Sequence, residues 1–181
     1  MGQHSHITKT IVNTLRWGLL AAALVAAAAI VPGIPRLHAA THTAEISIVS
    51  NKTSSGGFAF NGYQRGAMTV TVPVGWQIVV HFENTDTIGH SLAVLPSGAH
   101  NQPSPPSSPA FAGAATSNFS AGLPKGPAVT FTFEASKAGT YEFVCGVPGH
   151  AISGQWDALV VSATADAPSV TPAGAATITV K

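Results

Sequence analysis

The chain contains the stretch Gly139-Thr-Tyr-Glu-Phe-Val-Cys145-Gly-Val-Pro-Gly-His150-Ala-Ile-Ser-Gly-Gln155-Trp-Asp-Ala-Leu-Val-Val-Ser162. Its ends predict two β-strands, and the loop between them is stiffened by glycine and proline. Within this loop, Cys145, His150 and Gln155 offer a thiol, an imidazole and an amide as metal ligands. A soft thiolate close to an imidazole suits copper, zinc or iron. A weak amide donor, together with a second histidine upstream, favours copper.

Outward from this stretch, the chain shows further short segments of alternating or strand-like sequence without a convincing amphipathic helix. The predicted strands are 44–49, 58–60, 68–72, 76–82, 91–95, 129–133, 139–144 and 156–162. This pattern predicts an all-β fold, a Greek-key β-sandwich or barrel. Residues 96–127 are rich in Pro, Ser, Gly and Ala, and we expect a long loop with one short helix around 110–116.

The N-terminus has the features of a targeting segment, for which we predict a helical, hydrophobic leader. Lys9 and Arg16 precede the apolar residues 17–31, which fit a signal peptide and fall short of the roughly 20 residues that span a bilayer. Residues 37–40 offer a small-residue cleavage site. An uncleaved anchor stays open as the alternative, because residues 11–15 lengthen the apolar run, so that 11–31 would hold the protein at a membrane.

We therefore expect residues 1–41 to be a signal peptide or membrane anchor with a short linker. Residues 42–163 would form the copper-binding domain, and 164–181 a C-terminal tail that contributes an edge strand at 176–180 or stays loose. Both interpretations of the leader export the domain, so the predicted location is extracytoplasmic, in the periplasm or on the outer face of the cytoplasmic membrane.

Composition excludes some classes of function and supports the metal hypothesis. The chain has 181 residues, of which 45% are hydrophobic and 8% charged, enough apolar material for the core of one domain. A formal net charge of +1 offers no basic face for nucleic acid. Cys145 is the only cysteine, so it cannot form an internal disulfide in an oxidising compartment. Metal ligation explains its presence better than a structural role, given its neighbours.

The second imidazole has to come from a distant part of the chain, and His90 is the preferred candidate. It stands at the start of the predicted strand 91–95, after Gly89, which permits close approach of the backbone. His81 lies inside a strand pattern and is expected to face solvent. The other histidines lie in the leader, near the processing site or in the polar loop: His4, His6, His38, His42 and His100.

Three motifs resemble the cupredoxins, and within them most closely the sulfocyanin-type proteins, which are related to rusticyanin. They are the segment 139–151 with its cysteine and histidine, the segment Gly89-His-Ser-Leu-Ala-Val94, and Phe60-Asn-Gly62. The resemblance covers residues 44–162. It implies a Greek-key β-sandwich, one type 1 (blue) copper and electron transport in a membrane-associated respiratory chain. The implied partners are redox proteins: a cytochrome, a quinol-oxidising complex or a terminal oxidase.

Gln155 departs from the family, which ordinarily has a methionine at this position. The Cys-x4-His-x4-Gln spacing resembles the stellacyanins instead. An amide oxygen is a harder donor than a thioether sulfur, so it favours Cu(II), and we expect a lowered reduction potential. The predicted metal ligands are His90, Cys145, His150 and Gln155. Whether Gln155 ligates, or only faces a three-coordinate metal, stays open here.

Other functions remain as alternatives. A copper-binding carrier or storage protein without a redox role would share the same ligands. A cysteine–histidine nucleophilic enzyme would need an acidic residue or a helix N-terminus to activate the thiol, and neither is evident. One cysteine and few histidines leave no second copper cluster for oxygen or nitrite chemistry. We expect a monomeric electron carrier and no enzyme.

Overall fold

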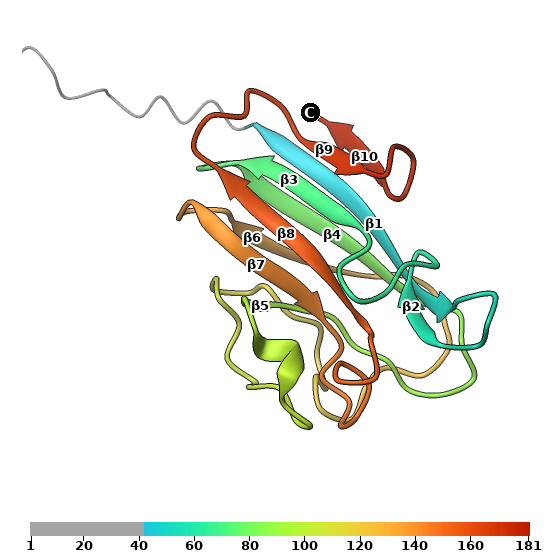
Figure 1. Cartoon of the computed structure of the whole chain (residues 1–181). Helices are drawn as coiled ribbons and strands as arrows, with labels where there is room; N and C mark the ends of the chain where they lie inside the picture. The colour runs from blue at the N-terminus through green and yellow to red at the C-terminus, as the bar shows by residue number, and fades with distance from the viewer. Residues whose placement is uncertain (1–41) are drawn as a thin grey trace, which may run out of the picture. The chain divides into compact units, whose positions relative to one another are not determined.

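The computed structural model describes residues 42–181 as a β-protein with one short 3₁₀ turn (Figure 1). The strands are β1 (Thr43–Lys52), β2 (Phe58–Phe60), β3 (Thr69–Pro73), β4 (Gln77–Asn84), β5 (Ala93–Pro96), β6 (Val129–Glu134), β7 (Gly139–Val144), β8 (Trp156–Ser162), β9 (Ser169–Thr171) and β10 (Thr177–Val180). The all-β prediction is confirmed for these residues. The predicted helical leader, with its signal peptide or anchor in 1–41, lies outside them.

The strands form two five-stranded sheets of mixed direction. One has the order β10-β1-β4-β6, with β2 also paired to β1, and the other has the order β5-β7-β8-β3-β9. The pairs β1–β4 and β3–β8 are parallel, whereas the other pairs are antiparallel. No helix within residues 42–181 has the length and apolar character to cross a membrane.

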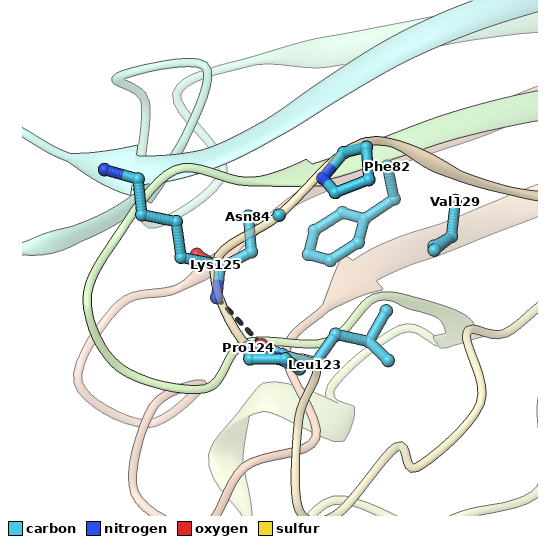
Figure 2. A pocket seen from close by; sticks show the side chains of 8 residues that line it. Phe82, Asn84, Leu123, Pro124, Lys125 and Val129 are labelled. Carbon is cyan, nitrogen blue, oxygen red and sulfur yellow. Dashed lines mark hydrogen bonds between the residues drawn. The ribbon is translucent and has the colours of Figure 1, made fainter.

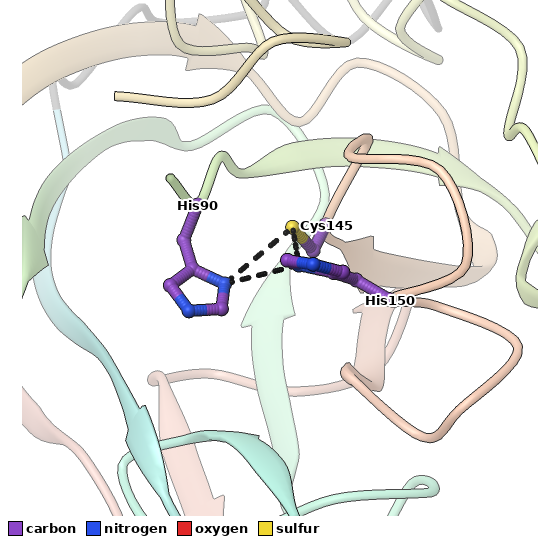
Figure 3. A group of neighbouring side chains, drawn as sticks. All are labelled: His90, Cys145 and His150. Atoms are coloured by element: carbon purple, nitrogen blue, oxygen red, sulfur yellow. Dashed lines mark hydrogen bonds between the residues drawn. The ribbon is translucent and has the colours of Figure 1, made fainter. Parts of the chain in front are cut away.

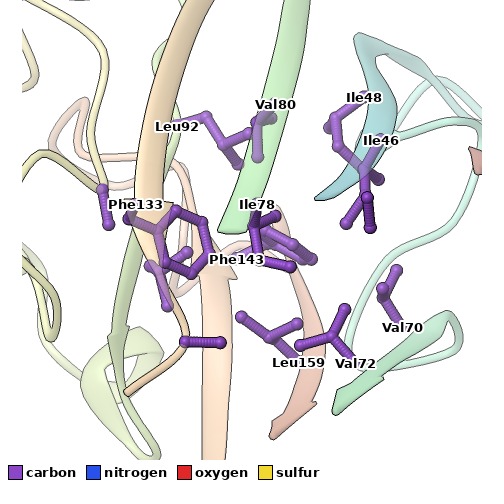
Figure 4. Packing of buried hydrophobic residues seen from close by; sticks show 14 of the residues in the cluster. Ile46, Ile48, Val70, Val72, Ile78, Val80, Leu92, Phe133, Phe143 and Leu159 are labelled. Atoms are coloured by element: carbon purple, nitrogen blue, oxygen red, sulfur yellow. The ribbon is translucent and has the colours of Figure 1, made fainter. Parts of the chain in front are cut away.

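The core lies between the sheets, because alternate residues of the strands point inward (Figure 4). Burial alternates residue by residue along β1, β4 and β8, which is the period-2 signal in their sequences. The buried side chains come from both sheets: Ile46, Ile48, Ile78, Val80 and Phe133 from one, Val70, Val72, Phe143 and Leu159 from the other. Cys145 belongs to the same cluster, so its thiol lies at the end of the core that β7 reaches.

The predicted short helix around 110–116 is wrong. Instead, the backbone of this segment pairs with β5 and the residue before it: Ala110 N donates to Val94 O, Val94 N to Ala114 O, and Thr116 N to Leu92 O. Intrinsic helix propensity is a weak preference even for alanine, and pairing with the open edge of β5 satisfies the same backbone groups inside the tertiary fold. The helical turn η1 lies earlier, at Ala99–Asn101.

A buried carboxylate anchors the beginning of the long 96–127 segment. Glu142 of β7 accepts hydrogen bonds from Gly98 N at 2.7 Å and His100 N at 3.2 Å, and its Oε1 lies 2.9 Å from His100 Nδ1. The His100 ring stacks on Trp156 with ring centroids 3.8 Å apart. The long segment is therefore attached beside the loop that carries Cys145 and His150.

The C-terminal segment supplies one strand to each sheet. β9 pairs antiparallel with β3 at the edge of the second sheet, and β10 pairs antiparallel with β1 at the edge of the first. Between them, Ala175 is buried and its carbonyl accepts a hydrogen bond from Asn61 Nδ2 at 2.9 Å. The edge strand expected at 176–180 is β10 (Thr177–Val180). The additional strand β9 was not expected, because its short Ser-Val-Thr sequence gave no strand signal.

Candidate metal centre

Two side chains of one loop, Cys145 and His150, meet the distant His90 at one end of the sheets (Figure 3). Cys145 directly follows β7, and His150 lies in the turn between β7 and β8. His90 precedes β5 and is held by a short antiparallel bridge, in which its backbone N–H and C=O both pair with Leu123. The ligand atoms of the three side chains all lie within 4.8 Å of one another.

The two rings present the same nitrogen to the sulfur. Cys145 Sγ lies 3.6 Å from His150 Nδ1 and 4.0 Å from His90 Nδ1, and the two Nδ1 atoms are 3.2 Å apart. Atoms at these separations can all lie within about 2.0–2.3 Å of one central cation, the usual length of zinc bonds to nitrogen and sulfur. The residues present therefore fit one first-row metal ion.

Gln155 is fully buried beside the same three atoms. Its Oε1 lies 2.8 Å from His90 Nδ1, and its Nε2 donates to Ser50 Oγ at 2.8 Å and to the Ala59 carbonyl at 3.4 Å. Because a backbone carbonyl can only accept, this contact assigns the NH₂ group to the Ser50 side and aims the amide oxygen at the centre. All four residues predicted from the sequence are thus brought together.

The sulfur is buried among hydrogen-bond donors. Ser91 N donates to Cys145 Sγ at 3.5 Å, and Ser91 Oγ lies 3.8 Å from it. Burial raises the pKa of the Cys145 thiol, although the backbone amides of Ser91 and Val147 and the Ser91 hydroxyl act in the opposite direction. A thiolate in this position therefore needs a cation next to it, and a metal ion would supply that charge.

The two imidazoles differ in exposure. His90 is fully buried, whereas His150 is partly accessible. Burial lowers the pKa of His150, and the neighbouring His90 lowers it further, which keeps His150 in the neutral form that binds metals. Phe58 of β2 packs against both rings, with centroids 4.3 Å from His150 and 5.4 Å from His90.

Comparison with known proteins agrees with this geometry. Residues 35–171 match the sulfocyanin (SoxE) domain family. The chain belongs to the sulfocyanin family. It is 32% identical over 127 residues to a sulfocyanin of Sulfolobus acidocaldarius, an alignment that covers 67% of this chain and 64% of that protein. The chain thus spans less than two thirds of the length of this relative.

The fold is also similar to crystal structures of rusticyanin. One, described as a copper protein, has a TM-score of 0.53 and 24% identity, over 66% of this chain and 78% of the other. Rusticyanin from Thiobacillus ferrooxidans gives a TM-score of 0.51 and 25% identity, over 66% and 77%. The predicted resemblance is confirmed, and in this sulfocyanin-family chain His90, Cys145 and His150 are positioned for one copper ion.

The residues that surround the candidate metal centre were not predicted from the sequence. Asp86 Oδ2 lies 3.3 Å from His90 Nε2, and its place four residues before His90 was a usable signal. Burial opposes ionisation of Asp86, but the Thr87 amide, His90 and the Lys52 charge together hold its pKa below the usual range. Ser50, which holds the Gln155 amide, stands 105 residues away from it and gave no signal.

An apolar pocket of about 220 Å³ is lined in part by Leu123, whose backbone pairs with His90, but by none of the four candidate ligands (Figure 2). Phe82, Leu123 and Val129 form much of its wall, and Asn84 Nδ2 donates to the Leu123 carbonyl at 2.8 Å. Lys125 is the one charged residue in its lining. Its lining has no thiol and no imidazole, the donors that make His90, Cys145 and His150 fit copper.

Proposed function

We propose that this sulfocyanin-family protein is a type 1 (blue) copper protein that carries single electrons, with His90, Cys145 and His150 as strong ligands and Gln155 as axial ligand. The observation that carries the proposal is the convergence of one sulfur and two Nδ1 atoms within 4.8 Å. Bound copper would supply the one-electron exchange between Cu(II) and Cu(I).

The chain's own residues hold the donors in place with a network of backbone hydrogen bonds. Cys145 N donates to Gln155 O at 3.2 Å, and Gln155 N donates to His150 O at 3.0 Å, so the ligand loop is closed on itself. Gly149 N donates to Pro103 O at 2.8 Å, which ties the loop to the long 96–127 segment. A site fixed in this way keeps its geometry when its charge changes, as a rapid electron carrier requires.

Axial ligation by Gln155 is supported by the direction of its amide oxygen. With Nε2 bound to Ser50 and the Ala59 carbonyl, Oε1 is the atom left to face the copper. An oxygen donor stabilises Cu(II) more than a thioether does, so the reduction potential is lowered relative to a methionine-ligated protein.

Replacement Gln155→Met is expected to raise the reduction potential. A tenfold change in the relative affinity for Cu(I) over Cu(II) corresponds to about 59 mV for one electron, and we expect at least this shift. Cyclic voltammetry of the copper-loaded variant measures it. Gln102→Met, a change in the exposed part of the long loop, is the matched control and leaves the potential unaltered. An unchanged or lower potential in Gln155→Met would contradict axial ligation.

The proposal extends to location and partners. We infer a monomer outside the cytoplasm, in the periplasm or on the outer face of the membrane. There it would accept electrons from one redox protein and pass them to another. Both partners would come from three classes: a cytochrome, a quinol-oxidising complex or a terminal oxidase. His150 would be the electron port, which is supported by its partial exposure next to Ile152, an apolar side chain that is 47% exposed. The role is that of a carrier and not of an enzyme.

A visible and EPR spectrum after addition of copper tests the proposal most directly. We expect intense visible absorption, a type 1 EPR signal and a reversible one-electron potential. A colourless protein with labile Cu(I) would instead support a copper carrier or storage protein. Alkylation of Cys145 by iodoacetamide in the copper-loaded protein would support a cysteine nucleophile, which full burial of this residue and the raised pKa of its thiol disfavour.

A further inference from the structure

The outer nitrogen of His90 faces a carboxylate that has a cation of its own. His90 Nε2 lies 3.3 Å from Asp86 Oδ2, and Asp86 Oδ1 lies 3.5 Å from Lys52 Nζ. The side chains are 0%, 7% and 47% exposed in the order His90, Asp86 and Lys52, so the row runs from the buried centre to solvent. Lys52 ends β1, the strand that also contributes Ser50 to the Gln155 amide.

The carboxylate is held in place by the turn that contains it. Asp86 N donates to Asn84 Oδ1 at 2.9 Å, and Thr87 N donates to Asp86 Oδ1 at 2.6 Å. Asn84 is itself fixed, because its Nδ2 donates to the carbonyls of Ile88 and Leu123. Asp86 is therefore aligned before any metal binds.

This alignment bears on which His90 nitrogen carries the proton. A neutral imidazole has one N–H, which can point to Gln155 Oε1, 2.8 Å from Nδ1, or to Asp86 Oδ2, near Nε2. The Gln155 contact is the shorter one, 2.8 Å against 3.3 Å, but Asp86 is charged and a charged acceptor forms the stronger hydrogen bond, so we expect the proton on Nε2. The Nδ1 lone pair is then directed at the point shared with Cys145 and His150.

We propose that Asp86 is a positioning residue that selects the metal-binding tautomer of His90 and, with Lys52 opposing it, sets the reduction potential of the copper. This inference rests on the proposed function. A poorly hydrated carboxylate next to a ligand stabilises the more positive, oxidised state, whereas a cation beyond it weakens that effect. Removal of the two charges should therefore shift the potential in opposite directions.

Asp86→Asn keeps the size and an oxygen acceptor but removes the charge. We expect the affinity ratio of Cu(I) to Cu(II) to increase about tenfold, which is a rise of about 59 mV. Lys52→Gln is expected to lower the potential by less, because this exposed cation is screened by solvent. Glu45→Gln is the matched control: Glu45 also accepts from a lysine, Lys181 at 2.6 Å, but touches none of the ligands. Its potential should equal that of the wild type.

Nitrogen-15 NMR of the copper-free protein, at a pH where histidine is neutral, provides a measurement independent of copper. We expect His90 to carry its proton on Nε2. A proton on Nδ1 would overturn the tautomer role, and a visible band with an unshifted or lowered potential in Asp86→Asn would overturn the tuning role.

If Asp86→Asn does not fold, the reduction potential of Lys52→Gln tests the tuning role instead. An unshifted or raised potential in that variant refutes the inference. Absence of the band in wild type would refute the proposed function as well, so the two failures are distinguishable.

Discussion

Replacement Cys145→Ser is expected to abolish the visible absorption of the copper-loaded protein. The thiolate is the soft donor of the proposed set, and the only cysteine of the chain supplies it. A serine hydroxyl has nearly the same size but is not ionised at neutral pH. The loss of copper affinity should exceed the about 10–100-fold effect that follows removal of an outer hydrogen-bond partner. Spectroscopic titration with copper measures both effects.

His81→Gln serves as the matched control for this prediction. His81 lies on β4 and pairs with Thr130 and Glu45, away from the candidate ligands. Its replacement is expected to leave the band and the affinity unchanged. Circular dichroism should show a folded β-protein for both variants. A Cys145→Ser protein that keeps the intense band would refute thiolate ligation.

Asp157→Asn is expected to remove a large pH dependence from the stability of the domain. Asp157 faces the core from β8 and is fully buried. Met68 N donates to its Oδ1 at 2.9 Å, whereas Oδ2 has no partner among residues 42–181. Burial raises its pKa to about 7, and the Met68 amide only partly offsets this. The folded protein thus holds a proton that the unfolded chain releases near pH 3.9.

The sign follows from this difference in proton binding. The stabilisation by the protonated Asp157 is complete below about pH 4 and is lost as the pH rises towards 7. At 1.36 kcal/mol per pKa unit, the wild type should lose roughly 3–4 kcal/mol of unfolding free energy relative to Asp157→Asn across this range. Urea denaturation of both copper-free proteins, at steps between pH 4 and pH 8, measures the difference. Parallel pH profiles would contradict the assignment.

The metal centre could be predicted because most of its donor residues lie close together in the sequence. Cys145, His150 and Gln155 share one short loop between two strands, and strand geometry leaves that loop at an end of the core. His90 could be chosen over His81 from its place after Gly89 at a strand start, although 55 residues separate it from Cys145. Soft and basic side chains concentrated in a stiff loop have few other uses.

The parts that could not be predicted depend on contacts across the fold. Ser50 meets Gln155 only because β1 and the β7–β8 loop end at the same place. The composition of segment 110–116 is compatible with a helix, yet its backbone forms hydrogen bonds with the open edge of β5. Local propensity is weak compared with such tertiary pairing, which requires the other strand to be known.

The order of the strands in the chain has a consequence for how the domain matures. β1 and β3 each receive their outer neighbour from β10 and β9, which follow all the other described strands. Until β9 and β10 have paired, β1 and β3 each keep an unpaired edge that other chains can pair with, which favours aggregation.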